Sequence, residues 1–582
     1  MIFQNLIAYY DRLDGTEDSG IPPWGFSREE IGFSIIVNRD GKMIGEPRDL
    51  RTKLAANKYE HFSSTVPYTN EVNVRTIAAS TTPNFLTDKA DYIFGMSDST
   101  EKPVHRKSFA ELVDKVAGQS DDPGLLAVKA FLAEWNPADS LDLPLWNEIC
   151  GLYGKWVAFE LEGERGFVHQ RPAVRALWQN YLEQKEKDEC KQGRSLVTNE
   201  IGTLQKQYAQ FKFGSGASLV SFNANAYESY GKERGDNAPI HIIDEFKSSA
   251  ALKYLFRSKT QRLSIGDVVT VFWTAQASPV ELFMSQVFNP PQKADEGNNA
   301  QLAAFLEAAR KGKNPQIPDY DGEVPFYILG FSLNKARLAL RFYHSCSVDE
   351  LKEKIGLHFK DLEMERSERD VEYPSVKQLL KETVRDHKDN PHELLSGALM
   401  RSILTGGKYP FSLYNSVLGR IRADQARKYN GKSIPNVNYL RAAILKAVLI
   451  RNYKREVPMS WDENEKRVPY LLGGLFAVME KAQLDALGKI SSTIRDRFYG
   501  AASATPKSVF PRLLRLAQHH ISKAEYGHLS DRRIGQLIEK INELDGKNEF
   551  PAHLTLEEQG LFAIGYYQQR NLLWRKKEGE EK

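Results

Sequence analysis

Cysteine and long apolar runs are scarce in this chain of 582 residues. Its three cysteines, Cys150, Cys190 and Cys346, lie far apart with no paired spacing, which argues against a disulfide framework or a cysteine zinc site. No stretch approaches the ~18 to 20 uninterrupted apolar residues of a membrane-spanning helix, and Lys446 interrupts the most apolar candidate. The N-terminus lacks the basic segment and cleavage site of a secretory signal, so we expect a cytoplasmic protein.

Catalytic signatures are missing as well. Gly431-Lys432-Ser433 has the end of a phosphate-binding P-loop, but Ala426 occupies the position of its first glycine. The Gly-x-Ser-x-Gly and His-Glu-x-x-His motifs do not occur, and the twelve histidines show no metal-ligand spacing. These absences predict a protein that is not an enzyme and has no catalytic residues, no metal and no cofactor. Carboxylates are abundant, so an enzyme of unfamiliar design stays an alternative.

The composition is that of a globular protein. Apolar residues make up 41% of the chain and charged residues 27%, and the length favours two to four structural units of about 150 residues each. Short runs rich in β-branched and aromatic residues predict strands at 33–37, 156–161 and 268–273. Residues 326–331 and 337–342 predict a hairpin.

The pattern becomes helical after Pro374. Leu413, Val417 and Ile421 lie on one face of a helix expected at 411–428, and Pro511 is well placed to begin another helix. We therefore expect an α+β fold, with a mixed α/β region of about two-thirds of the chain followed by an all-α helical bundle. The polar stretch 292–318 predicts an exposed, disordered insertion. The expected domains are 1–160, 161–374 with a Gly/Ser/Asn loop at 214–231, and 375–582.

Charge is unevenly distributed along the chain. Residues 400–582 hold 31 Lys and Arg against 19 Asp and Glu, whereas the residues before 400 hold 48 against 57. The segment 400–455 alone carries twelve basic residues and one acid, Asp424. Such an excess is typical of a surface that binds a polyanion. The alternative is a solvated helical face, or one that docks against acidic groups of the same chain.

Two loops are rich in small residues that form hydrogen bonds without adding charge. The first lies at 214–231 and the second at 68–86, and both have the composition of segments that contact phosphates or base edges. The alternative for each is an ordinary surface loop. The candidate motif-reading residues are Thr69, Asn70, Asn73, Arg75, Asn84, Ser218, Asn223 and Asn225.

Blocks of sequence in these same regions resemble one known family. They include Pro83-Asn-Phe-Leu86, Leu219-Val-Ser-Phe-Asn223, Tyr470-Leu-Leu-Gly-Gly-Leu-Phe476 and Thr493-Ile-Arg-Asp-Arg497, and they follow one another in the family's order over nearly the whole chain. The chain is similar to the Csd family, the large subunit of the type I-C CRISPR interference complex, Cascade. It departs from the family's pattern at 195–213.

The resemblance implies a binding subunit without catalytic residues. Such subunits sit at the end of a guide-RNA filament, recognise a short protospacer-adjacent motif in double-stranded DNA, assist R-loop formation and hold the displaced strand. The implied partners are the guide RNA, the backbone and 5′-handle-binding subunits, the target DNA and the Cas helicase-nuclease. The resemblance also implies a small subunit translated from the C-terminal region, for which Met459 is a better start than Met479.

The basic helices are the candidates for gripping single-stranded DNA, because backbone contacts tolerate any sequence. The candidate residues are Arg420, Arg427, Arg451, Lys454, Arg495, Arg497, Arg512 and Arg515. Two other functions stay open on the residues alone. One is a nucleic-acid-cleaving enzyme, and the other is a ribonucleoprotein scaffold outside CRISPR systems.

Overall fold

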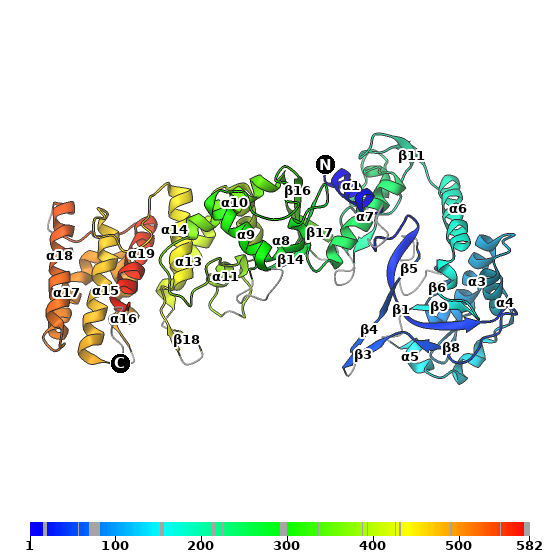
Figure 1. The fold of residues 1–582 in the computed structure, drawn as a ribbon, viewed down its shortest axis with the longest axis horizontal. Helices are drawn as coiled ribbons and strands as arrows, with labels where there is room; N and C mark the ends of the chain where they lie inside the picture. Colours follow the sequence, from blue (N-terminus) through cyan, green and yellow to red (C-terminus); the bar gives the residue numbers. More distant parts are fainter. Residues whose placement is uncertain are drawn as a thin grey trace. The chain divides into compact units, whose positions relative to one another are not determined.

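The chain forms two compact units in a computed structural model (Figure 1). One unit comprises Met1–Ser258 with Leu333–Ala339, and the other comprises Lys259–Ser332 with Leu340–Lys582. The expected domains 1–160, 161–374 and 375–582 stay a prediction. The structure describes residues 1–14, 20–55, 58–68, 82–151, 156–211, 217–222, 225–290, 299–334, 337–386, 388–392, 394–424, 427–429, 432–488, 490, 492–546 and 549–575.

The first unit is built on a mixed sheet around a long strand, β1 (Phe26–Val37). β1 pairs antiparallel with β2 (Arg48–Asp49) and β5 (Phe62–Pro67) and parallel with β9 (Trp156–Leu161), and β6 (Thr87–Asp88) pairs antiparallel with β9. The strands expected at 33–37 and 156–161 are confirmed, and their parallel pairing is new. The three longer helices on this core each begin with a proline, which suits the first helical position. They are α3 (Pro103–Ala117), α4 (Pro123–Glu134) and α6 (Pro172–Glu189).

A second part of this unit pairs two helices far apart in sequence. α1 (Ile2–Asp14) packs on α7 (Ile242–Arg257), with ring centroids 6.3 Å apart for Tyr9 and Tyr254 and 6.0 Å apart for Tyr10 and Phe246. Short antiparallel pairs complete this part. They are β10 (Gln192–Arg194) with β11 (Ile201–Thr203), and β12 (Gln210–Phe211) with β13 (Ala217–Ser218).

The second unit begins with consecutive neighbouring strands. β14 (Arg262–Ile265) and β15 (Val268–Thr274) are followed by β16 (Pro325–Asn334) and β17 (Arg337–Ser347), which confirms the expected strand at 268–273 and the expected hairpin. β15 is almost entirely buried. The helices of this part are α8 (Val280–Phe288), α9 (Asn299–Lys311) and α10 (Val348–Leu362).

The prediction of an exposed, disordered insertion at 292–318 is wrong for the residues that form α9. Leu302, Phe305 and Leu306 of this helix are buried in the core of the second unit. Their spacing is that of one helical face, and the polar residues around them hid it. Residues 291–298 lie outside the described part of the chain.

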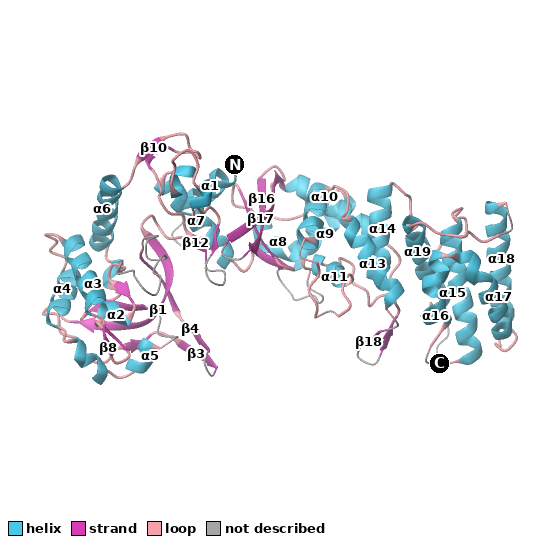
Figure 2. Cartoon of the chain, turned by 180° about the vertical axis from the view of Figure 1, so that it is seen from behind, coloured by secondary structure: helices cyan, strands magenta, loops and turns pink. Residues whose placement is uncertain are grey.

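Among the residues after 374 that the structure describes, the regular secondary structure is helical except for one hairpin, β18 (Arg427–Tyr429) with β19 (Lys432–Ile434) (Figure 2). The expected α+β fold with a helical C-terminal region is confirmed. The helices are α11 (Val376–Lys381), α12 (Leu395–Thr405), α13 (Phe411–Ala423), α14 (Tyr439–Tyr453), α15 (Val468–Leu487), α16 (Ile494–Ala504), α17 (Pro506–Ile521), α18 (Gly527–Asp545) and α19 (Leu556–Trp574).

Helix ends differ from two expectations. The helix expected at 411–428 ends at Ala423, and α17 begins at Pro506 rather than at Pro511, which lies inside it. Pro506 directly follows the N-cap Thr505, so this proline occupies the favourable first position. Among the described residues, no helix is long and apolar enough to cross a membrane.

Candidate nucleic-acid interface

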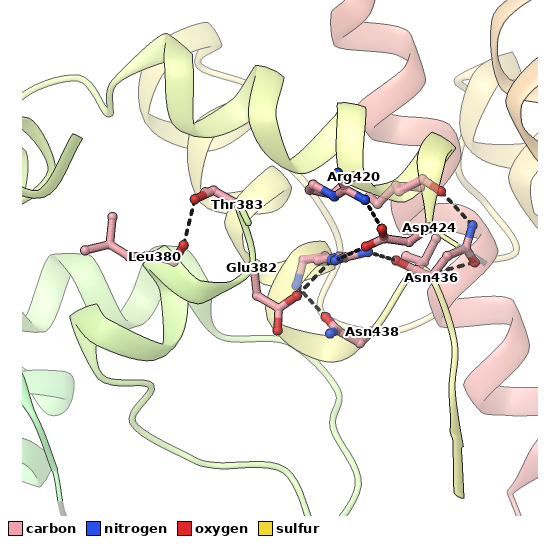
Figure 3. Close-up of polar contacts among 10 residues, drawn as sticks. Leu380, Glu382, Thr383, Arg420, Asp424, Asn436 and Asn438 are labelled. Carbon is pink, nitrogen blue, oxygen red and sulfur yellow. Dashed lines mark hydrogen bonds and ion pairs between the residues drawn. The ribbon is translucent and has the colours of Figure 1, made fainter. Parts of the chain in front are cut away.

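Much of the positive charge in the segment 400–455 is used inside the second unit. The guanidinium of Arg441 on α14 donates from Nε to Glu382 Oε2 at 2.8 Å and from Nη2 to Asp424 Oδ2 at 2.7 Å (Figure 3). Its Nη1 donates to the carbonyl of Asn436 at 2.8 Å, so the buried guanidinium has partners on all three nitrogens. The acidic partner Glu382 directly follows α11 in the same unit. Part of the positive charge of the segment 400–455 is therefore neutralised by acids of its own unit.

Arg420, a candidate strand-binding residue, belongs to the same cluster. It ion-pairs with Asp424, the carboxylate that also binds Arg441, and it is half-buried (Figure 3). Asp424 is therefore shared between two cations at the end of α13. The side chain of Arg427 lies outside the described residues, and its backbone begins β18.

Arg451 lies inside the second unit and is not exposed to solvent. Its Nε donates to Asp361 Oδ2 at 2.7 Å, and its guanidinium lies over the ring of Tyr409 at 4.2 Å from the centroid. Burial raises the pKa of the Asp361 carboxyl, against the opposing effect of Arg451. Because both charges are buried and paired, Arg451 is a partner of Asp361 within the fold in this arrangement and is not available to a DNA strand.

Arg495 and Arg497 come from one sequence block but lie in different environments. Arg495 is buried beside Glu480 of α15, with Nη1 3.6 Å from Oε1, and Tyr566 of α19 donates to Glu480 Oε2 at 2.6 Å. Burial raises the pKa of Tyr566 well above its ordinary value, so its hydroxyl stays a donor. Arg497, two residues further along α16, is exposed.

The exposed candidates gather on α16 and α17. Arg512 and Arg515 are exposed and one helical turn apart, and Arg512 lies over the ring of Phe498 at 5.3 Å, next to Arg497. α17 contains no Asp or Glu, and among the described residues no carboxylate lies within ion-pair distance of these three arginines. This group of Arg497, Arg512 and Arg515, the α16/α17 basic face, is chemically suited to phosphates. Lys454, at the end of α14, is also exposed.

Most of the candidate motif readers lie outside the described residues. These are Thr69, Asn70, Asn73, Arg75 and Asn223, and of Asn225 only the backbone is described, at the start of a 3-10 turn. Asn84 is buried, and its amide donates to the carbonyl of Thr87 at 3.0 Å, which ties a turn together. Ser218 is half-buried in β13 and is paired with Arg337 of β17. The structure does not bring Asn84 to the surface.

The chain is similar to one known protein family over nearly its whole length. Residues 6–574 match the family described as CRISPR-associated protein (Cas_Csd1). The chain belongs to this family. The match confirms the resemblance to the large subunit of type I-C Cascade found in the sequence blocks. No curated protein matches the chain.

This Csd-family chain contains a cavity lined by basic and aromatic side chains, which the sequence did not predict. It measures about 420 Å³, lies in the first unit, and is lined by residues of β1, α6, α7 and the intervening segments. Six Lys or Arg and two Glu line it together with Trp24, Tyr68, Phe246 and Tyr254. Tyr68 is the first residue of the loop at 68–86 that is expected to read the motif. Sequence patterns could not reveal this cavity, because its lining comes from six separate segments of the chain.

Metal-binding groups are not seen in the part of the chain that the structure covers. No group of three or more His, Cys, Asp or Glu among those residues is placed to hold an ion. Carboxylates such as Glu480 and Asp361 are buried against arginines instead. The candidate binding surfaces among the described residues are therefore the α16/α17 basic face and the cavity lined by basic and aromatic side chains.

Proposed function

We propose that this chain is the large subunit of a type I-C Cascade and that it binds DNA without cutting it. It recognises the protospacer-adjacent motif in double-stranded DNA, assists R-loop formation and holds the displaced strand. Base pairing with the guide RNA supplies the remaining specificity. The observation that carries the proposal is the family match over residues 6–574.

The distribution of charge supports two binding regions. The first unit contributes the proposed motif-reading loops at 68–86 and 214–231, and it also holds the cavity that Tyr68 and basic side chains line. The second unit contributes the α16/α17 basic face together with the exposed Lys454, whereas the candidate Arg420 is half-buried and ion-paired with Asp424. Neutral hydrogen-bonding groups suit base edges, and unpaired arginines suit the backbone of a single strand.

The proposed partners are those of the family's complex. They are the guide RNA, the backbone and 5′-handle-binding subunits, and the Cas helicase-nuclease that cuts the DNA. The small subunit would be translated internally from Met459, giving 124 residues that contain α15 to α19. Met479 is buried within α15, so a start there would remove the first half of that helix.

The experiment compares assembled complexes with and without this chain. The complex is purified with its guide RNA, and its affinity is measured for duplexes that carry the correct motif or a mutated one, without nuclease. We expect tight binding only with this chain present and the correct motif. Replacing Asn70 and Asn73 with Ala together should weaken the discrimination. Equal capture of target duplex by complexes that lack the chain would contradict the proposal.

A further inference from the structure

Tyr230 is placed at the tip of a tight turn in the first unit, where its side chain is 98% exposed. The backbone N–H of Lys232 donates to the carbonyl of Ser229 at 3.0 Å, and the two residues form a β-bridge. The turn therefore consists of Tyr230 and Gly231. No large apolar side chain is more exposed among the described residues.

The backbone at Tyr230 is unfavourable for its residue type. Its φ is 54° and that of Gly231 is 69°, so both central residues have the positive φ of a type I′ turn. Glycine suits such a position, and asparagine or aspartate tolerates it, whereas a bulky side chain there costs conformational free energy. The turn would form more readily with another residue in place of Tyr230. A strained and fully exposed aromatic side chain is consistent with a role in binding.

The neighbouring side chains indicate which ligand fits. Arg337 lies over the ring of Tyr227 at 4.5 Å from the centroid, and Lys232 and Arg234 follow the turn. Glu228 and Glu233 offset part of this positive charge. In residues 225–241 the exposed large apolar side chains are Tyr227 and Tyr230, with no aliphatic residue among them. Flat rings beside cations suit nucleobases and phosphates. Tyrosine and arginine also occur at protein interfaces, so a protein contact is the alternative that the experiment below separates.

We propose that Tyr230 stacks on an unpaired nucleobase of the opened target DNA. This inference rests on the proposed function and adds a contact to the 214–231 loop. Bases within an intact duplex are covered by their neighbours on both faces, so the ring requires a base freed by strand separation. Stacking on tyrosine is tolerant of sequence, and it keeps the two strands from pairing again.

Three variants test the inference in the assembled complex with its guide RNA. Tyr230→Ala should weaken the affinity for a target duplex with a pre-opened bubble beside the motif by about fivefold to 150-fold, the range expected from loss of one base stack. Tyr230→Phe retains the ring and should bind within about twofold of the parent. Tyr230→Asn removes the ring but suits a positive φ, so it should raise the unfolding temperature while binding as weakly as the alanine variant.

A fluorescent base reports the contact directly. Single 2-aminopurine substitutions across the bubble should give one position where fluorescence is quenched by the parent and by Tyr230→Phe but not by Tyr230→Ala. Unchanged DNA affinity of Tyr230→Ala, in a complex that still requires this chain and the correct motif, would overturn the inference and leave the proposed function intact. Loss of the chain from the assembled complex in Tyr230→Ala would assign the ring to a protein contact and would also overturn it. A parent complex that ignores the motif would contradict the proposed function itself.

Discussion

Gly473 of α15 and Gly565 of α19 each face the backbone of the other helix. A Cβ on Gly473 would lie 2.1 Å from the carbonyl oxygen of Phe562, and a Cβ on Gly565 would lie 2.1 Å from that of Tyr470. The two helices, which lie side by side (Figure 1), can therefore approach at this crossing only without side chains. This close packing explains why Gly473, in the block Tyr470–Phe476, and Gly565 are both glycines.

Either glycine should therefore be intolerant of alanine. We expect Gly473→Ala and Gly565→Ala each to lower the free energy of unfolding by about 1–3 kcal/mol, because the backbones must move apart. Gly535 in α18 is a matched control, since it is helical and exposed and a Cβ there meets no atom within 4 Å. Gly535→Ala should stabilise by about 0.5–1 kcal/mol. Chemical denaturation checks all three, and equal effects would contradict the close approach.

The buried Arg441 gives a second stability prediction. Arg441→Met removes the cation from two buried carboxylates, so Glu382 and Asp424 lose their shared partner. We expect a loss of about 3–5 kcal/mol. Arg422→Met, at an exposed position of α13, is the control and should change stability by less than about 0.5 kcal/mol. Denaturation midpoints of the two variants measure the difference, and similar midpoints would show that Arg441 is not structurally required.

The sequence predicted elements better than it predicted the roles of charges. β15 and the β16–β17 hairpin were readable because dense β-branched and aromatic runs leave few alternatives. The roles of Arg441, Arg451 and Arg495 were not readable. Glu382 and Asp424 lie 59 and 17 residues from Arg441, and Asp361 lies 90 residues from Arg451, so no helical or strand periodicity links these pairs. Exposed arginines such as Arg512 have no sequence feature that distinguishes them from these buried ones. Only the packed structure separates arginines that are exposed to solvent from arginines that are paired inside the fold.

A buried histidine predicts the pH dependence of stability. His169 is fully buried and stacks on Phe167 with centroids 5.4 Å apart, and burial together with Arg175 lowers its pKa to about 3. The unfolded chain takes up this proton near pH 6.5, and the folded chain does so only near pH 3. His169 therefore does not lower the free energy of unfolding above about pH 6.5. As the pH falls below this value, the unfolded chain gains a proton that the folded chain does not, and stability is lost.

His169→Phe should remove this part of the pH dependence. Phenylalanine preserves the stack and leaves no ring nitrogen to protonate, so the stability difference between pH 8 and pH 5 should shrink by about 2 kcal/mol. Urea denaturation at the two pH values measures it. An unchanged difference would show that His169 is protonated in the folded protein at pH 5.

The α16/α17 basic face predicts a change in salt dependence. Replacing Arg512 and Arg515 with Gln should weaken the binding of single-stranded DNA by the assembled complex. It should also reduce the slope of log affinity against log salt by about 1.4, at roughly 0.7 per phosphate contact. Lys360→Gln with Lys377→Gln removes two exposed charges from the same unit and is the matched control. Equal salt-dependence slopes for the two double variants would show that the α16/α17 basic face does not contact the DNA strand.

The packing around Trp461 predicts where a separately translated small subunit begins. Trp461 stacks on Tyr470 with centroids 4.9 Å apart, and it covers Gly474, where a Cβ would lie 2.2 Å from the indole. A start at Met459 keeps this contact, whereas a start at Met479 loses it together with half of α15. We therefore expect Met459→Leu to abolish a co-purifying fragment of 124 residues. Met479→Leu, a change of similar volume, should leave that fragment in place. N-terminal sequencing of the fragment decides between the two, because a band that survives Met459→Leu and begins at Met479 would show that the bundle assembles without Trp461.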